Sequence, residues 1–169
     1  MSGSIPSIID ILIVIDAEGL VGAYPPGTPT QPTMVDKPLI YMMVRQENAD
    51  FGNGSDELKV VAQTEDVIRW RETSLSLNGD YSAVLYDFFA LRGDDLISKP
   101  EPLIATVKVP LPNPAAPLSP GYQTTSNYFW TSTVLSPGET TYAFRFAVMD
   151  RQGAIQGYFA WDPFIKISD

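Results

Sequence analysis

The sequence predicts an all-β protein, and more specifically a single-domain antiparallel β-sandwich of the jelly-roll or immunoglobulin-like type with about ten short strands. The first observation is a series of short runs rich in β-branched and aromatic residues, which recur roughly every ten residues. The second is the set of turn signals between them, such as Asn78-Gly79-Asp80 and Ser136-Pro137-Gly138. The third is the absence of a long apolar pattern with helical period. Because 169 residues suit one domain, we expect residues 1–169 to form a single β-sandwich.

The N-terminal third of the chain contains a strand, a short helix candidate and a loop. The first expected strand, Ile8–Asp16, is apolar on both faces except at Asp10, which predicts a central strand. We expect at most one or two short helices, and segment 16–24 is the first candidate. Residues 24–38 contain five prolines, which exclude a helix and a central strand and predict an extended surface loop.

The other expected strands follow from β-branched and aromatic runs bounded by turns. They are Leu39–Arg45, Leu58–Gln63, Val67–Arg71, Ser82–Leu91, Ile104–Val109, Asn127–Val134, Thr141–Met149, Gln156–Ala160 and Phe164–Ile167. The run Val84–Arg92 is also compatible with a helix, because periodicity alone does not separate a buried strand from a helix segment. Residues 110–121 are again rich in proline, and we expect a second extended loop there.

Composition excludes more chemistry than any motif does. The chain has no His and no Cys, so it contains no Ser-His-Asp triad, thiolate nucleophile, disulfide or Cys-ligated metal site, and we expect no cofactor. The net charge is −9, which disfavours binding to nucleic acid or to an anionic membrane. The N-terminus shows no signal-peptide pattern, and the first apolar run is too short to cross a bilayer. We therefore expect a cytoplasmic protein.

The first candidate binding site is the cluster around Trp70. On a strand over Val67–Arg71, Arg69 and Arg71 share one face about 7 Å apart, where they could clamp a carboxylate or a phosphate. Trp70 shares the opposite face with Ile68. The alternative is that both arginines pair with surface acids or stack on aromatic rings.

The second candidate site is Trp161-Asp162, which lies in the aromatic segment 157–164. An aromatic ring beside a carboxylate suits a sugar, because the ring packs on C–H groups while the acid accepts hydrogen bonds from hydroxyls. The alternative is a core Trp161, with Asp162 accepting backbone N–H groups at the turn before Pro163. Acid-rich turns leave a calcium-assisted site open. Segment 50–56 does not match the helix–loop–helix calcium pattern, however, and we assign no metal ligands.

Several segments in this order resemble one known family. They are Ile9–Asp16, Tyr24-Pro25, Tyr41-Met42, Asp56-Glu57-Leu58 with Ala62, Ile68-Arg69-Trp70-Arg71 with Ser74-Leu75-Ser76, Tyr142 with Phe144, and Gly157–Ile165. The chain resembles the bacterial inclusion-body protein family, the PixA/AidA-like proteins, over nearly its whole length. The Ile-Arg-Trp-Arg and Trp-Asp-Pro segments are the specific parts.

The resemblance implies a small cytoplasmic bacterial protein that forms a β-sandwich. It also implies relatives that accumulate as crystalline inclusions and others that are linked to quorum sensing and host association. It implies no established enzymatic activity and no established site residues. Inclusion-forming relatives are described as rich in methionine, and this chain departs from them with 5 Met.

Two functions follow as expectations. The first is a non-enzymatic, self-associating protein that forms homodimers or larger assemblies when exposed strands pair edge to edge. The alternative is a lectin-like carbohydrate site or other small-ligand site, with or without the assistance of calcium. Its candidate contacts are Arg69, Trp70, Arg71, Trp161 and Asp162. An enzyme with paired carboxylates is a third class, but no catalytic residue follows from the sequence.

Overall fold

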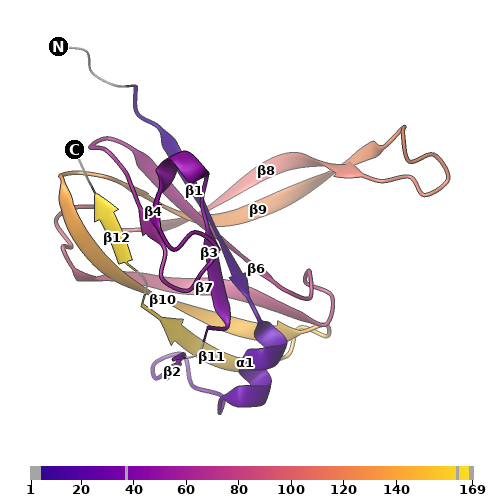
Figure 1. The fold of residues 1–169 in the computed structure, drawn as a ribbon. Coiled ribbons are helices and arrows are strands. Elements are labelled where there is room, and N and C mark those ends of the chain that lie inside the picture. The colour runs from indigo at the N-terminus through magenta and orange to yellow at the C-terminus, as the bar shows by residue number, and fades with distance from the viewer. Residues whose placement is uncertain (1–4, 37, 163, 168–169) are drawn as a thin grey trace.

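The computed structural model describes residues 5–36, 38–162 and 164–167. Most of these residues form strands, and the only helices among them are α1 and the short 3-10 helix η1 (Figure 1). The elements in order are β1 (Ile8–Ile15), α1 (Ala17–Ala23), β2 (Thr33–Met34), β3 (Ile40–Met43), η1 (Gln46–Asn48), β4 (Ala49–Phe51), β5 (Lys59–Val60), β6 (Val67–Ser74), β7 (Tyr81–Arg92), β8 (Glu101–Leu111), β9 (Gly121–Thr133), β10 (Gly138–Asp150), β11 (Ile155–Trp161) and β12 (Phe164–Ile167). The all-β prediction is confirmed, while the jelly-roll or immunoglobulin-like type stays a prediction.

Two large sheets carry the fold. The first has the strand order β3-β1-β6-β9-β8. In the second sheet, β10 pairs with β7 along one edge. Its other edge pairs with β12 near the start of β10 and with β11 further along, and β2 lies beyond β11. The prediction of a purely antiparallel arrangement is wrong, because β1 pairs with β6 and β2 pairs with β11 in parallel. Parallel neighbours need a long connection, and residues 16–66 supply it between β1 and β6.

The core lies between the two sheets. The inward side chains of β1 are four isoleucines that are all buried, and β1 lies between β3 and β6, so the prediction of a central strand is confirmed. From the other sheet, Tyr142, Phe144 and Phe146 of β10 are equally buried. The Nε1 of Trp70 donates a hydrogen bond to the Tyr142 hydroxyl across the two layers at 3.1 Å. This bond satisfies a polar group that burial would otherwise leave unpaired.

Two ambiguous segments are resolved by their neighbours. The run Val84–Arg92 is part of strand β7, which pairs along the length of β10, so the helix alternative is wrong there. The helix candidate after β1 does form as α1. The Asp16 side chain accepts a hydrogen bond from the Gly19 backbone N–H at 2.9 Å and so caps the helix.

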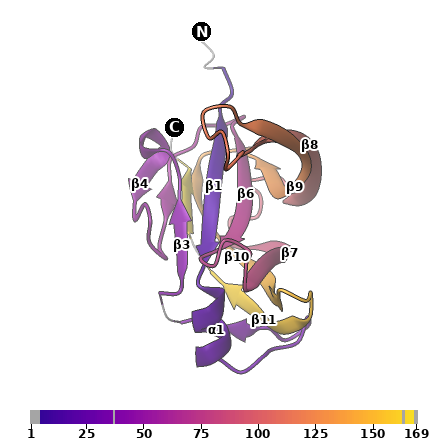
Figure 2. The same cartoon turned by 90° about the vertical axis from the view of Figure 1, so that its right-hand side faces the viewer.

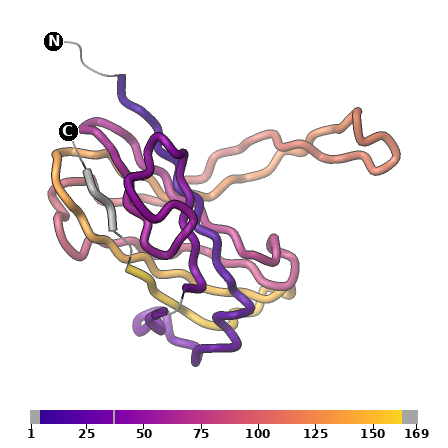
Figure 3. The backbone as a smooth tube through the Cα atoms, in the orientation of Figure 1, coloured from indigo at the N-terminus to yellow at the C-terminus, as the bar shows by residue number. Residues whose placement is uncertain are grey.

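A long hairpin leaves the body of the molecule. Strands β8 and β9 pair from Glu101–Thr131 to Leu111–Gly121, but β9 pairs with β6 only over Val67–Trp70. Beyond that point the hairpin projects away from both sheets, as Figures 1 and 3 show. We call residues 104–128 the arm and residues 112–120 its tip. The expected loop over 110–121 is therefore shorter than predicted, because an edge strand such as β8 tolerates a proline in its ladder.

Candidate functional site

A groove of about 420 Å³ lies on the outer face of the first sheet, where the arm leaves the body. Figure 2 shows β1 and β6 side by side, with β8 and β9 curving away next to them. Residues of all four strands line the groove because alternate side chains of a strand share one face. The lining includes Asp10 and Leu12 of β1, Arg69 and Arg71 of β6, Ala105 and Val107 of β8, and Asn127 and Phe129 of β9.

Arg69 is neutralised by a neighbour within the sheet. Asp10 and Arg69 are register partners of the parallel β1–β6 pair. Their side chains form two hydrogen bonds, Nε to Oδ1 at 2.6 Å and Nη2 to Oδ2 at 2.8 Å. These bonds raise the pKa of Arg69. The guanidinium also lies over the Phe129 ring, 5.4 Å from its centroid. The alternative interpretation of the sequence, a surface ion pair with aromatic stacking, therefore describes Arg69.

Arg71 differs from Arg69 in forming no ion pair within 4 Å among the described residues. It is also exposed. Its register partner on β1 is Leu12, which is 38% exposed. The groove thus combines apolar walls with the donor groups of Arg71 and Asn127, so it suits a partner that offers apolar surface and hydrogen-bond acceptors.

The predicted tryptophans lie in the core. Trp70 is fully buried, and Trp161 is 8% exposed with its Nε1 donating to the Asp56 carbonyl at 3.2 Å. Neither ring can stack on a ligand from solvent, so the core alternative describes Trp161, and Trp70 is a core residue as well. Asp162 is exposed and directly follows β11, which is a strand of the second sheet. The structure therefore does not bring Trp161 and Asp162 together with the arginine groove.

Sequence reasoning missed one titratable group, Glu72. It follows Arg71 on β6 and alternates onto the inner face, and its Oε2 is buried with no hydrogen-bond partner among the described residues. Burial raises the pKa of Glu72 to about 7. Smaller effects lower this pKa: hydrogen bonds from the backbone N–H groups of Glu72 and Leu85, and the positive charge of Arg71. The signal was available, because strand alternation places residues 68, 70, 72 and 74 on one face.

The comparisons with known proteins identify the family. The family model described as "Inclusion body protein" matches residues 7–167. The chain belongs to the inclusion body protein family. The crystal structure of an inclusion body protein (PixA) from Burkholderia cenocepacia matches with a TM-score of 0.83 and 19% identity, covering 99% of each chain. At that identity the likeness shows the fold, and the resemblance stated from the sequence is confirmed.

Two other solved structures match more weakly. The cysteine protease inhibitor EhICP2 from Entamoeba histolytica has a TM-score of 0.32 and 14% identity, over 65% of this chain and 86% of that one. The solution structure of Amebosin has a TM-score of 0.29 and 10% identity, over 73% and 93%. Neither likeness carries an argument about this family member. The search of curated proteins found no match.

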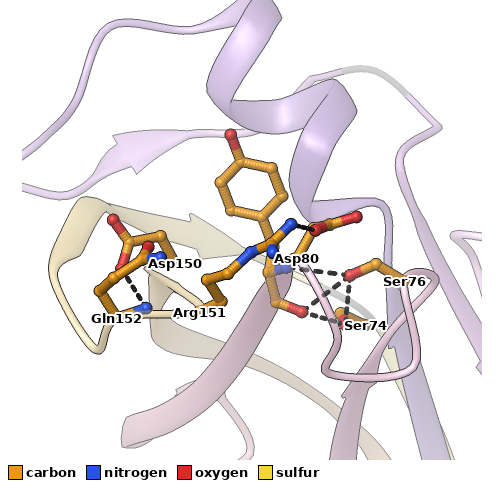
Figure 4. A network of polar contacts seen from close by, with 7 residues as sticks. Ser74, Ser76, Asp80, Asp150, Arg151 and Gln152 are labelled. Atoms are coloured by element: carbon orange, nitrogen blue, oxygen red, sulfur yellow. Dashed lines mark hydrogen bonds and ion pairs between the residues drawn. The ribbon is translucent and has the colours of Figure 1, made fainter.

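A polar network at the turns of this inclusion body family protein has a structural role. Figure 4 shows Arg151, in the β10–β11 turn, pairing with Asp80 in the β6–β7 turn. Beside it, the hydroxyls of Ser74 and Ser76 donate to the Tyr81 carbonyl at 2.5 and 2.8 Å. A serine that donates to a carbonyl is not activated by a base. The network ties two turns together and shows no nucleophile.

In the described ranges, no group of three or more Asp or Glu side chains is placed to hold a metal ion. Asp16, one of the acids in the acid-rich turns, caps α1 instead. Likewise, none of the described helices has the length and apolar character that a membrane-spanning helix needs.

Proposed function

We propose that this inclusion body family protein is a non-enzymatic protein that self-associates through its arm. The observation that carries the proposal is the composition of the arm and its flanks. Residues 102–138 contain a single charged side chain, Lys108, whereas 18% of the whole chain is charged. Charge depletion is typical of surfaces that become buried in protein–protein contacts.

The arm also has an apolar face that remains partly exposed. Strand alternation places every second residue of β8 on the face that continues into the groove. In the arm these residues are Ala105, Val107, Val109 and Leu111, and Leu103 continues the same face just before the arm. Leu103 is 46% exposed and Leu111 is 48% exposed. A two-stranded ribbon is marginally stable unless its apolar face packs on something, and a second copy of the chain would supply that cover.

The prolines of β8 argue against pairing along the β8 edge, which is one form of the edge pairing that we expected from the sequence. Pro102 and Pro110 stand within the β8–β9 ladder but have no N–H, so the nitrogen side of each must face the open edge. By the same alternation, Lys108 also presents its backbone to that edge. Prolines and a lysine on an edge strand protect it against strand addition.

The non-enzymatic part of the proposal rests on the chemistry present. The chain has no imidazole and no thiol, and the hydroxyls of Ser74 and Ser76 donate to a backbone carbonyl instead of to a base. We extend the proposal to a cytoplasmic location, which a chain without cysteine suits. Any link to quorum sensing or to host association would rest on the family resemblance alone.

A shortened arm tests the proposal. Replacing residues 108–124 by Asn-Gly joins the register partners Val107 and Thr125 through a tight turn and leaves the groove walls in place. We expect the wild-type chain to gain mass with concentration in sedimentation experiments and the shortened chain to stay monomeric, with a similar melting temperature. A wild-type chain that stays monomeric at millimolar concentration would refute self-association. Equal association of both chains would refute the role of the arm.

A second candidate function is binding of a small ligand in the groove, and the observation that favours it is that Arg71 has no ion-pair partner among the residues that the structure describes. Because the walls are apolar and both predicted tryptophan platforms are buried, the groove suits an organic carboxylate better than a sugar. A thermal-melt screen against organic acids and sugars, with calcium or a chelator, tests this. Stabilisation that is present in the wild type and absent in Arg71→Gln would support it, and a flat response would refute it.

A further inference from the structure

We infer that the arm tip of one copy inserts into the groove of a second copy, with Leu118 as its anchor. The inference rests on the proposed self-association and names the two surfaces that meet. Leu118 is 99% exposed, so its side chain contributes nothing to the packing of its own chain. A large apolar side chain at the end of a projecting hairpin is the form that interface anchors take.

The tip holds Leu118 in a defined place. Four of its nine residues are prolines, which restrict the backbone before any contact is made. Three hydrogen bonds close it further: Ala116 N–H to the Asn113 carbonyl at 3.0 Å, Ser119 N–H to the Ala116 carbonyl at 2.9 Å, and Ala115 N–H to the Asn113 side chain at 3.0 Å. A preordered tip loses little conformational entropy on binding.

The polar groups of tip and groove are complementary. Proline has no N–H, and three of the five remaining backbone N–H groups of the tip already donate within it. The tip therefore offers mainly carbonyl acceptors. Arg71 offers only donors and has no ion-pair partner in the described part of the chain. Beside Arg71, Leu12 and Phe129 provide the apolar wall for Leu118.

The tip cannot reach the groove of its own chain. Val107 lines the groove, and the tip begins at Pro112, about 17 Å further along the ribbon at the rise of an extended strand. Folding back would break the β8–β9 ladder. A second copy is the favoured occupant over an acidic peptide, because every copy presents an uncharged tip while the chain as a whole carries −9.

Tip and groove are different surfaces, so each copy can use both. Two copies can exchange arms around a two-fold axis, or successive copies can join head to tail into an open chain. Sedimentation at rising concentration separates these outcomes, since the first stops at a dimer and the second continues to larger assemblies. Both contain the proposed contact.

Charge exchange tests the contact in the full-length chain. Leu118→Lys places a cation against Arg71, and Arg71→Glu removes the donor; each should weaken self-association roughly tenfold or more. The double variant Leu118→Lys/Arg71→Glu restores opposite charges, and we expect it to recover most of the affinity. The matched control is Ile155→Lys, which changes a 44% exposed side chain of the second sheet and should leave association unchanged.

The outcomes separate this inference from the proposed function. If the wild-type chain is monomeric throughout, both fail. If the wild type associates and the single variants associate equally well, self-association stands and the contact between tip and groove is overturned. Loss in both single variants without recovery in the double variant would assign the two surfaces to different contacts and also overturn it. Leu118 is fully exposed, so a melting curve for each variant verifies the fold.

Discussion

Glu72 makes the stability of the fold depend on pH near neutrality. Its side chain lies on the inner face of β6, and its Oε2 is buried without a partner among the described residues. Burial raises its pKa to about 7, compared with 4.5 for an unperturbed glutamate. A group whose pKa is higher in the folded state favours folding when it is protonated. The folded state is therefore most stable below about pH 4.5 with respect to this group, and it loses stability as the pH rises toward 7.

The magnitude follows from the shift in pKa. A shift from 4.5 to about 7 corresponds to roughly 3 kcal/mol between the two limits. Of this, about 2 kcal/mol is lost between pH 5.5 and 7.5. Carboxyl groups with ordinary pKa values have finished titrating by about pH 5.5. The chain has no histidine, so the usual source of pH dependence in this window is absent.

Urea unfolding followed by tryptophan fluorescence measures this effect. We expect the free energy of unfolding of the wild type to fall by about 2 kcal/mol from pH 5.5 to 7.5. Glu72→Gln should remove most of that slope, because an amide does not ionise. Glu101→Gln, which changes an exposed glutamate of β8, should keep the wild-type slope. A flat wild-type profile, or an unchanged slope in Glu72→Gln, would refute the reasoning.

Three further predictions follow from burial and charge. Trp161→Ala should destabilise the fold by about 3–5 kcal/mol in urea unfolding, because the ring is buried, and a loss below about 1 kcal/mol would place it on the surface. Asp10→Asn should cost less than about 1 kcal/mol despite the two hydrogen bonds to Arg69, because both side chains are partly exposed; a larger loss would make this pair a core element of the fold. Raising the NaCl concentration from about 0.05 M to about 0.5 M should strengthen self-association in sedimentation experiments, because salt screens the repulsion between copies of charge −9. Weaker association at the higher salt concentration would indicate a charge-driven contact instead.

The local sequence pattern predicted the strands whose own apolar and aromatic residues indicate a buried face. The aromatic run predicted a strand over Thr141–Met149, and in β10 the alternate residues Tyr142, Phe144 and Phe146 are buried in the core. The apolar run over β1 predicted a central strand for the same reason. Pattern alone did not settle Val84–Arg92, because an apolar run suits a buried strand and a buried helix equally. The pairing of β7 with β10 decides that case, and this pairing is a tertiary contact.

The candidate site was only partly predictable. Alternation correctly placed Arg69 and Arg71 on one face of β6, but it did not show that Asp10 lies opposite Arg69. That neighbour depends on the parallel pairing of β1 with β6, which brings together residues 59 positions apart. The groove itself exists because β9 separates from β6 after Trp70, and no local pattern encodes where two strands part. The tryptophans misled because an aromatic residue next to an acid looks the same in sequence whether the ring is exposed or buried.

The distribution of charge explains why contacts between copies should run through the arm. Residues 102–138 carry one Lys and no acid, so the rest of the chain holds 10 basic and 20 acidic side chains, a net charge of −10. Two such bodies repel each other, and the repulsion grows as they approach. The arm projects beyond them, so a contact made by its tip keeps the bodies further apart than direct packing would. An assembly of this acidic protein therefore gains most by joining an uncharged tip to the one groove cation, Arg71, that has no ion-pair partner in the described part of the chain.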